Sequence, residues 1–360
     1  THVASQAGYG QLVAMNADGT TFATITTSDG DIRLLNDSDS TLSIRDATGK
    51  VLSSTVLSFP GVTKLAISAD GNTVVCGNND GLLQIWDGEG NPLREPFEAH
   101  ADRIGSVAID ADGSSIVSSS RDETIRLWDP EGKLIKAFLV EDRGWVTAVD
   151  ISPDGHTIYV AKRSSGSRLQ SLDREGNIIT KFPEKEGVNP IIALSVSADN
   201  QTIVSGSNDA AIRLWSTQGE LVSGPFIGHV GPVSSVDITA DGQSMLTASD
   251  GSAKLWNRQG DSIEIVASSS SPVTRSAMSD DGNTIITSNS DLSFENPDGD
   301  GGVLKIWHSS EASLFRKFDL PSRLARFVSI DEHGKSVAVV GRDKAVWLLN
   351  AQGQLIENSF

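Results

Sequence analysis

The sequence predicts an all-β fold built from eight copies of one unit, and three observations lead to this prediction. Each copy has an apolar run, an Asp-Gly-type turn, a second apolar run, a polar turn, a third run and a glycine turn. Successive Asp-Gly-type turns are 52, 42, 42, 45, 42, 40 and 52 residues apart. The runs are short and rich in β-branched residues, as strands are. Three or four short strands in a unit of about 42 residues predict a closed β-propeller.

The eight copies divide the chain into blades. Their first turns begin at Asp18, Asp70, Asp112, Asp154, Asp199, Asp241, Asp281 and, in altered form, His333. The 360 residues give each of eight four-stranded blades about 45 residues, and no linker separates the copies. We therefore predict one propeller over residues 1–360, with a ring of seven blades as the alternative. The expected blades are residues 10–58, 61–101, 103–142, 144–187, 189–229, 231–270, 272–321 and 323–360.

The third copy shows the expected elements in order. Its first run alternates and is rich in β-branched residues, and Asp112-Gly113 supplies the positive φ angles of a tight hairpin. Its second run consists of small residues, which suit a crowded blade interior. Asp122 follows in a turn, where its carboxylate can accept hydrogen bonds from nearby backbone N–H groups. The expected strands of this copy are residues 104–109, 115–120, 124–129 and 133–138.

Two ways of closing the ring fit the sequence. The ring must close because each copy buries its faces only against its neighbours, and an open ring would leave edges exposed. The last copy has its own outer strand at residues 354–357, so the first and last blades can meet by face packing. Alternatively, residues 1–5 add a strand to the last blade and join the two ends.

Several recurring residues connect these copies to a known family. Five copies end their third strand with an apolar residue followed by a Trp, at Trp86, Trp128, Trp215, Trp256 and Trp307. A His precedes the first strand at His100 and His229, and an Asp occupies the second turn at Asp80, Asp122, Asp209, Asp250 and Asp343. Over nearly the whole chain this pattern resembles the WD40 repeat family. Three copies depart from it and have Arg45, Leu172 and Leu349 in place of the Trp.

The resemblance implies structural roles for these residues. In WD40 repeats the His, a second-strand Ser, the turn Asp and the Trp form a hydrogen-bonded group within one blade. Two copies have the residues for it: His100, Asp122 and Trp128 in one, and His229, Asp250 and Trp256 in the other. A catalytic Ser-His-Asp set is the alternative, but such a set is expected once rather than at repeated positions. We expect these two blades to be the stiffest.

The composition disfavours several classes of protein. The formal net charge of −18 favours solubility and opposes nucleic-acid binding, which depends on Lys and Arg neutralising phosphates. The sequence has no apolar run long enough to span a membrane and no visible signal peptide. Cys76 is the one cysteine and lies in an apolar run, so we expect it in the core. We expect a monomeric cytoplasmic ring, and the missing initial Met is consistent with an excised domain.

No catalytic or cofactor site is predicted. Of the six His residues, two occupy repeat positions and two occupy hairpin turns, so no metal cluster is apparent. No Walker-type phosphate loop is present. The expected function is a non-catalytic scaffold that presents a ring face to a partner protein or peptide. The alternatives are a sensor domain of a larger signalling protein and, less favoured, a propeller enzyme or a calcium-dependent binder.

Two Trp residues outside the repeat positions are candidates for partner binding, since Trp is enriched among interface anchors. Trp145 precedes the first strand of the fourth copy, and basic residues are expected around it at Arg103, Arg121, Arg143, Lys162 and Arg163. This group could hold an acidic or extended peptide. Trp347 takes the position of Arg126, where a side chain is expected to lean toward solvent. The alternative for Trp145 is a partly buried side chain that fills the space of the missing Trp.

Two copies contain insertions between their second and third strands, at residues 28–39 and 290–302. Copies one and seven flank copy eight, so both insertions are expected in one sector of the face with the His loops. They are acidic and include apolar candidates for partner contact at Leu34, Leu35 and Phe294. Asn296, Asp298 and Asp300 fit the first half of a calcium loop, although its bidentate Glu is missing. The alternatives are loops without function and a plain polar turn.

Overall fold

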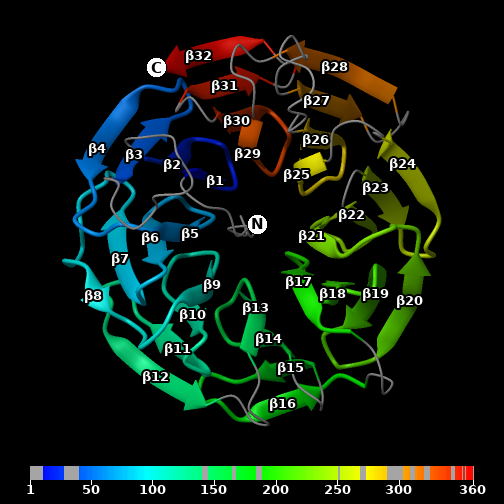
Figure 1. Cartoon of the computed structure of the whole chain (residues 1–360), viewed down its shortest axis with the longest axis horizontal. Coiled ribbons are helices and arrows are strands. Elements are labelled where there is room, and N and C mark those ends of the chain that lie inside the picture. Colours follow the sequence, from blue (N-terminus) through cyan, green and yellow to red (C-terminus); the bar gives the residue numbers. More distant parts are fainter. Residues whose placement is uncertain are drawn as a thin grey trace, which may run out of the picture.

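The computed structural model of the chain describes residues 11–27, 40–139, 145–163, 168–183, 189–249, 252–267, 273–289, 303–308, 313–319, 325–341, 345–350, 352 and 354–359. Their strands form eight four-stranded antiparallel sheets, arranged as blades around a central axis (Figure 1). The predicted all-β propeller with eight blades is therefore confirmed. In these segments no helix is long and apolar enough to cross a membrane.

Each blade consists of four strands that follow one another in the chain. Blades 1 to 4 contain β1 (Gln11–Met15), β2 (Thr21–Thr27), β3 (Ser40–Asp46), β4 (Val51–Val56), β5 (Val62–Ile67), β6 (Thr73–Asn78), β7 (Leu82–Asp87), β8 (Phe97–Glu98), β9 (Ile104–Ile109), β10 (Ile116–Ser120), β11 (Thr124–Trp128), β12 (Leu134–Leu139), β13 (Trp145–Ile151), β14 (Ile158–Arg163), β15 (Leu169–Leu172) and β16 (Ile178–Lys181). Blades 5 to 8 contain β17 (Ile191–Val196), β18 (Thr202–Ser207), β19 (Ala211–Ser216), β20 (Leu221–Ile227), β21 (Val233–Ile238), β22 (Ser244–Ser249), β23 (Ser252–Asn257), β24 (Ser262–Ala267), β25 (Val273–Met278), β26 (Thr284–Asn289), β27 (Val303–His308), β28 (Ser313–Asp319), β29 (Ala325–Ile330), β30 (Ser336–Gly341), β31 (Val346–Asn350) and β32 (Leu355–Ser359).

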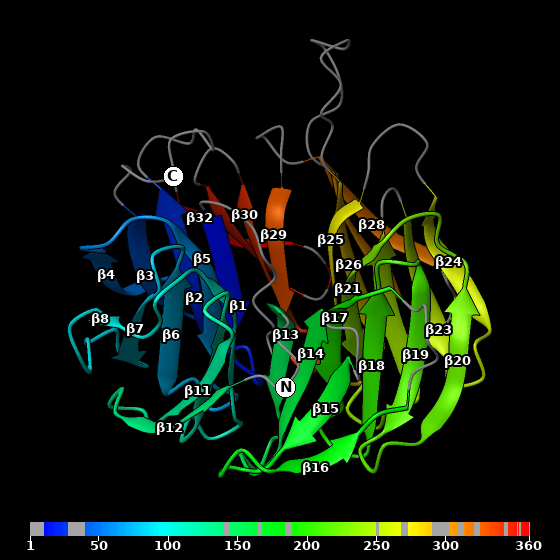
Figure 2. The same ribbon diagram turned by 60° about the horizontal axis from the view of Figure 1, so that its bottom comes forward.

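The first strand of each blade is the innermost and the fourth is the outermost (Figure 1). Because neighbouring strands are antiparallel, the connections fall on two opposite faces of the ring (Figure 2). We call the loop face the one with the connections between blades and between second and third strands. The turn face holds the remaining connections, from first to second and from third to fourth strands. The start of every first strand therefore lies at the loop face.

The first turn of each blade needs a residue with positive φ, as the Asp-Gly pattern predicts. Gly113 has a φ of 74°, and Asn200, which replaces the glycine in blade 5, has a φ of 53°. Asn is one of the few other residues that tolerate this conformation. A Cβ on Gly113 would lie 2.5 Å from Oγ1 of Thr73 in the preceding blade. The glycine therefore permits both the tight turn and the close approach of neighbouring blades.

Backbone hydrogen bonds connect the first turns of neighbouring blades. The N–H of Ala17 donates to the carbonyl of Ala69 at 3.1 Å, and the N–H of Ala111 donates to the carbonyl of Pro153 at 3.2 Å. Pro153 occupies the donor position in blade 4 and has no N–H. Pro153 thus lacks the donor that Ala17 and Ala111 use, whereas in blades 2 and 5 the N–H of the following residue, Asp70 or Asp199, donates to the next blade.

A buried carboxylate connects blades 4 and 5. Asp150 in β13 accepts a hydrogen bond from the backbone N–H of Val196 in β17 at 3.1 Å. Burial raises the pKa of Asp150 to about 7. Asp237 in blade 6 repeats the arrangement and accepts from the N–H of Met278 in blade 7 at 3.0 Å. Acidic side chains thus reinforce two of the contacts between innermost strands.

The last blade closes the ring by face packing. Its fourth strand, β32, pairs with β31 of the same blade. Val340 of blade 8 belongs to a buried apolar cluster that also contains Leu12 of blade 1 and extends to blade 2. The N–H of Glu332 donates to the carbonyl of Ala17 at 2.8 Å between the same two blades. The first of the two predicted closure modes is confirmed, and residues 1–5 of the alternative lie outside the described residues.

Candidate functional site

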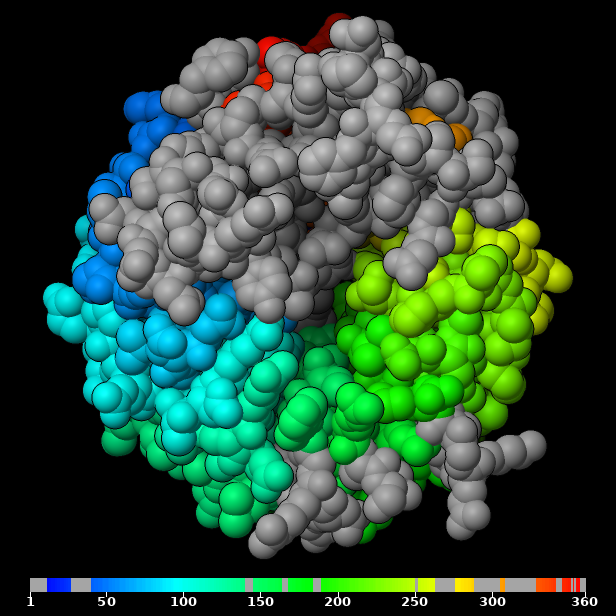
Figure 3. Space-filling view, viewed as in Figure 1, coloured from blue at the N-terminus to red at the C-terminus, as the bar shows by residue number. Residues whose placement is uncertain are grey.

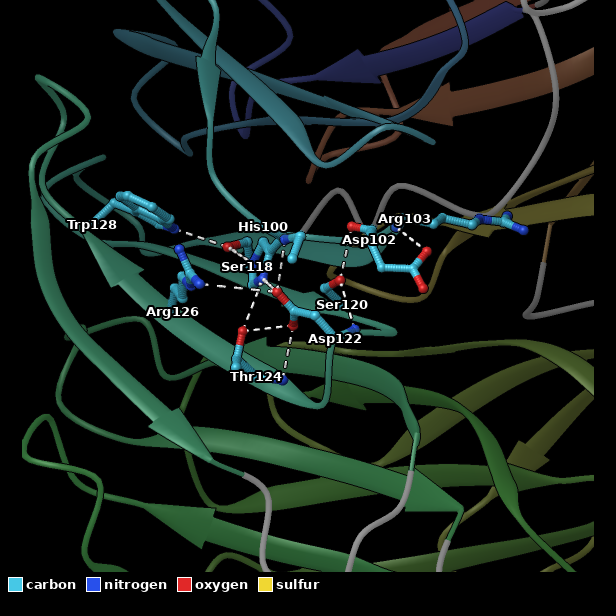
Figure 4. A network of polar contacts seen from close by, with 10 residues as sticks. His100, Asp102, Arg103, Ser118, Ser120, Asp122, Thr124, Arg126 and Trp128 are labelled. Carbon is cyan, nitrogen blue, oxygen red and sulfur yellow. Dashed lines mark hydrogen bonds and ion pairs between the residues drawn. The ribbon is translucent and has the colours of Figure 1, made fainter.

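A buried polar network connects side chains of blade 3 (Figure 4). Nδ1 of His100 lies 3.0 Å from Oδ2 of Asp122, and Nε2 of the same ring lies 2.7 Å from Oγ of Ser118. The indole N–H of Trp128 donates to Ser118 Oγ at 2.8 Å. The hydroxyl of Thr124 donates to Oδ1 of Asp122 at 2.6 Å. The structure therefore brings together the His, Asp and Trp that the WD40 resemblance placed in one blade.

Burial sets the protonation state of this network. It lowers the pKa of His100, so the neutral imidazole donates from Nδ1 to Asp122 and accepts at Nε2 from the Ser118 hydroxyl. Burial acts to raise the pKa of Asp122, but hydrogen bonds from Thr124 and from the Ala101 N–H outweigh it and lower the pKa. The Ser118 side chain is 0% exposed. No substrate can therefore reach the one oxygen that resembles a catalytic nucleophile in this arrangement.

Blade 6 contains a related network. Nε2 of His229 lies 2.7 Å from Oγ1 of Thr247, and the indole N–H of Trp256 donates to the same oxygen at 2.7 Å. Nδ1 of His229 lies 2.9 Å from Oγ of Ser252. Burial lowers the pKa of His229 to about 4. Asp250, the expected acidic member, lies outside the described residues, so the structure brings together His229 and Trp256 through Thr247.

The third-strand Trp residues share one hydrogen-bond pattern with one exception. The indole N–H groups of Trp215 and Trp307 donate to Ser205 Oγ at 2.9 Å and to Thr287 Oγ1 at 3.1 Å. Trp86 is equally buried, but its Nε1 has no hydrogen-bond partner. By strand register Cys76 occupies the position that holds a hydroxyl in the other blades. The expectation that Cys76 lies in the core is confirmed, and its thiol explains the unpaired indole.

A charged aromatic surface lies on the loop face where blades 3 and 4 meet. We call it the Trp145 surface, and it consists of Arg103, Arg121, Trp145 and Arg163. The Trp145 side chain is 50% exposed, and the guanidinium carbon of Arg121 lies 5.3 Å from the centroid of its ring. The N–H of Arg121 donates to the carbonyl of Arg103 at 3.1 Å, and Arg163 is the register partner of Trp145. Both Arg121 and Arg163 are exposed.

The space of the missing Trp in blade 4 is not filled by Trp145. Leu172 occupies that position and is buried in one cluster with Phe138 and Ile158. Trp145 is absent from this cluster, and half of its side chain faces solvent. The structure therefore favours the exposed arrangement of Trp145 over the partly buried alternative.

Lys162 does not belong to the Trp145 surface, and its expected place at the rim is wrong. It is 1% exposed and pairs in register with buried Val146. The equivalent residues in blades 3 and 5, Ser120 and Ser207, are buried as well, because this end of the second strand lies between the other strands of its own blade and the adjacent blade. Lys162 and Arg163 are neighbours in the sequence, but successive side chains of a strand point to opposite sides, so only Arg163 faces the Trp145 surface.

Trp347 is also buried, so the expectation that it leans toward solvent is wrong. It is 2% exposed and packs in a cluster with Ile286 and Ile306 of blade 7. The third strand of a blade is covered on both sides by neighbouring blades, and alternate residues face each of them. Trp347 and Leu349 lie two residues apart and therefore point the same way. The indole of Trp347 thus supplies aromatic volume to the interface where Leu349 replaces the usual Trp.

The remaining predicted residues cannot be placed. Arg143, both insertions at 28–39 and 290–302, the apolar candidates and the calcium candidates lie outside the described residues: Leu34, Leu35, Phe294, Asn296, Asp298 and Asp300. Within the described segments, no group of three or more His, Cys, Asp or Glu side chains could hold a metal ion. The calcium site therefore stays a prediction.

Comparison with protein families gives a match at the predicted repeats. The WD domain, G-beta repeat family matches residues 52–87, 90–129, 177–216 and 220–257. Each segment ends with a third strand that carries the recurring Trp, at Trp86, Trp128, Trp215 and Trp256. The chain belongs to the WD40 repeat β-propellers. The networks around His100 and His229 are thus WD40 networks within single blades.

Curated relatives of this WD40 chain are distant and cover parts of it. It is 27% identical over 82 residues to pre-mRNA-processing factor 19 of Oryza sativa subsp. japonica, covering 23% of this chain and 16% of that protein. It is 28% identical over 158 residues to the ribosome biogenesis protein YTM1 of Meyerozyma guilliermondii, covering 41% of this chain and 32% of that protein. The chain thus matches less than a third of the length of each relative.

Solved structures with the same fold cover nearly the whole WD40 ring. The C-terminal WD40 domain of Sif2 superposes with a TM-score of 0.72 at 19% identity, covering 96% of this chain and 97% of that one. The computationally designed Ika8 protein gives a TM-score of 0.71 at 20% identity, covering 97% and 98%. At these identities the likeness establishes the fold and carries no statement about function.

Two contributions to the WD40 ring were missed by the sequence analysis. Thr124 completes the network of blade 3, and Asp150 connects blades 4 and 5. A signal for Asp150 was present in the repeat. Ala66 and Ala108 occupy its position in blades 2 and 3 and are buried, so an acid at that position departs from the pattern.

Replacing Ser118 by Ala should lower the stability of the ring. The change removes the partner of the Trp128 N–H and of His100 Nε2 within a buried network, at a cost of about 2 kcal/mol in the free energy of unfolding. Thermal unfolding followed by circular dichroism measures the effect. Ser119→Ala is the matched control, because Ser119 is equally buried and its hydroxyl has no hydrogen bond. Equal midpoints for the two variants would show that the network does not stabilise the fold.

Replacing Cys76 by Ser should stabilise blade 2. The new hydroxyl would accept from the unpaired indole N–H of Trp86, as Ser205 does from Trp215, and raise the free energy of unfolding by about 1 kcal/mol. Cys76→Ala is the control, since it removes the sulfur without adding an acceptor. The midpoint is expected to rise for the Ser variant and to fall for the Ala variant. A fall in both would contradict the assignment of Cys76 to the hydroxyl position.

Proposed function

We propose that this WD40 propeller is a non-catalytic interaction scaffold that presents its loop face to a partner protein or peptide. The observation that carries the proposal is the Trp145 surface, where a half-exposed indole lies under the guanidinium of Arg121. Trp and Arg are enriched among the residues that dominate binding energy at interfaces. Strand ends and loops held by a rigid scaffold are common binding elements.

The chemistry of the described residues supports binding over catalysis. Ser118 pairs with His100, which in turn pairs with Asp122, but Ser118 is fully buried and already accepts from Trp128. Burial lowers the pKa values of His100 and His229, and each ring is enclosed by hydrogen-bond partners. The polar residues that resemble catalytic groups are therefore used within the blades.

The names of two relatives support the proposal that this chain acts together with other proteins. They refer to pre-mRNA processing and to ribosome biogenesis. Both are processes in which many components act, and this common element supports a scaffold role for the present chain. The small share of each relative that is matched gives no reason to transfer either process.

Replacing Trp145 by Ala should remove partner binding while the ring stays folded. Losing a half-exposed interface anchor is expected to weaken binding at least about tenfold. Affinity capture from native lysate, quantified by mass spectrometry, compares the intact chain with the variant. Leu134→Ala is the control, because Leu134 is 42% exposed on the outer strand of blade 3 and thus on the side of the ring. Capture that is unchanged by Trp145→Ala, or lost with both variants, would contradict the proposed use of the loop face.

A further inference from the structure

We propose that the Trp145 surface binds an acidic peptide segment. Carboxylates of the segment would pair with Arg121 and Arg163, and an apolar side chain between them would cover the exposed part of the Trp145 indole. This inference rests on the proposed scaffold function and specifies the chemistry of the partner. It is carried by the arrangement of Arg121 and Arg163 beside the Trp145 ring and by the absence of an ion pair of these two arginines among the described residues.

The arrangement places two cations beside one aromatic ring. The guanidinium of Arg121 lies 5.3 Å from the ring centroid of Trp145, a distance at which the cation is attracted to the ring. Arg163 is the register partner of Trp145 in the adjacent strand β14. Directly opposed residues of antiparallel strands project from the same side of the sheet, with Cβ atoms about 5 Å apart. Arg121 and Arg163 therefore both lie close to the indole.

Among the described residues, Arg121 and Arg163 differ from other arginines of the ring in forming no ion pair. Arg126 lies 3.9 Å from Asp122, and Arg213 lies 3.7 Å from Asp209. By contrast, no ion pair of Arg121 or Arg163 exists in the part of the chain that the structure describes. Arg121 and Arg163 are both exposed residues, as a contact with a carboxylate of a bound peptide requires.

The polar network of blade 3 holds Asp122, the acid that follows Arg121 in the chain, away from this surface. Asp122 follows Arg121 in the chain, but its Oδ2 faces Nδ1 of His100 and accepts from the Ala101 N–H at 3.0 Å. Its Oδ1 accepts from the N–H and the hydroxyl of Thr124. The side chain of Asp122 is 8% exposed. The carboxylate therefore has its hydrogen-bonding capacity filled on the inside of the blade.

The charge of the chain favours a short peptide over a nucleic acid. The net charge is −18, so an extended polyanion would be repelled over most of its length. Exposed charges act over about 8 Å at physiological ionic strength, so the local arginines dominate the field felt by one or two carboxylates. The indole adds an apolar contact that a phosphate backbone does not use.

Selection from a library of random dodecapeptides displayed on phage tests the inference on the full chain. Selected peptides are expected to have Asp or Glu on both sides of an apolar residue. Fluorescence anisotropy of a labelled selected peptide then measures affinity. The double variant Arg121→Glu, Arg163→Glu is expected to bind at least about tenfold more weakly, and replacing the acids of the peptide by Lys should restore part of the binding.

The control variant changes the net charge by the same amount as the double Arg→Glu variant, but on the turn face. Lys50 and Lys133 are exposed at the turn face, and Lys50→Glu with Lys133→Glu should leave the affinity of the peptide unchanged. The inference is overturned if selection yields no peptides or peptides without acids, if the control weakens binding equally, or if a labelled single-stranded oligonucleotide binds the same surface as tightly. Loss of partner capture with Trp145→Ala, together with selected peptides that lack acids, would retain the scaffold function and reject the acidic partner.

Discussion

The packing between blade 8 and blade 1 is the contact on which the whole ring depends. Every blade buries its faces against its neighbours, and a ring without this contact would expose two apolar faces at once. No exchanged strand reinforces it in the described residues, because β32 completes the last blade on its own. Instead, Val340 and Leu348 of blade 8 share a buried cluster with residues of blades 1 and 2, including Leu12 and Trp86. A backbone hydrogen bond from the Glu332 N–H to the Ala17 carbonyl also connects the two closing blades.

A closed ring also explains how the Trp145 surface is held in place. Trp145 begins β13, and the same strand contains Asp150, whose carboxylate connects it to blade 5. Arg121 and Arg103 are joined by a backbone hydrogen bond, and the Ser120 hydroxyl donates to the carbonyl of Asp102 at 2.9 Å. These contacts order the backbone of the surface, which would lower the entropic cost of binding the proposed peptide. The same residues that stiffen the blades therefore prepare the surface.

The fold was predictable because the same sequence unit recurs in every blade. The composition of the Trp145 surface depends instead on the direction in which each side chain points. Eight spaced turns were sufficient to predict the number of blades, and the resemblance to WD40 repeats predicted the polar network of blade 3. Lys162 and Trp347 were placed wrongly because burial at the end of a second strand and within a third strand comes from the adjacent blade, and one copy considered alone does not contain that neighbour. The stacking of Arg121 on Trp145 joins residues of two blades, so only the assembled ring defines it.

Native-state hydrogen exchange of the Glu332 amide tests the closure of the ring most directly. This N–H donates across the junction of blades 8 and 1, just as the Ala111 N–H donates across the junction of blades 3 and 4. If face packing closes the ring, the protection factors of the two amides should agree within about tenfold, because both junctions then open at similar cost. If the Glu332 amide exchanges like an unprotected amide while the Ala111 amide stays protected, the ring opens between blades 8 and 1, and packing alone does not close it.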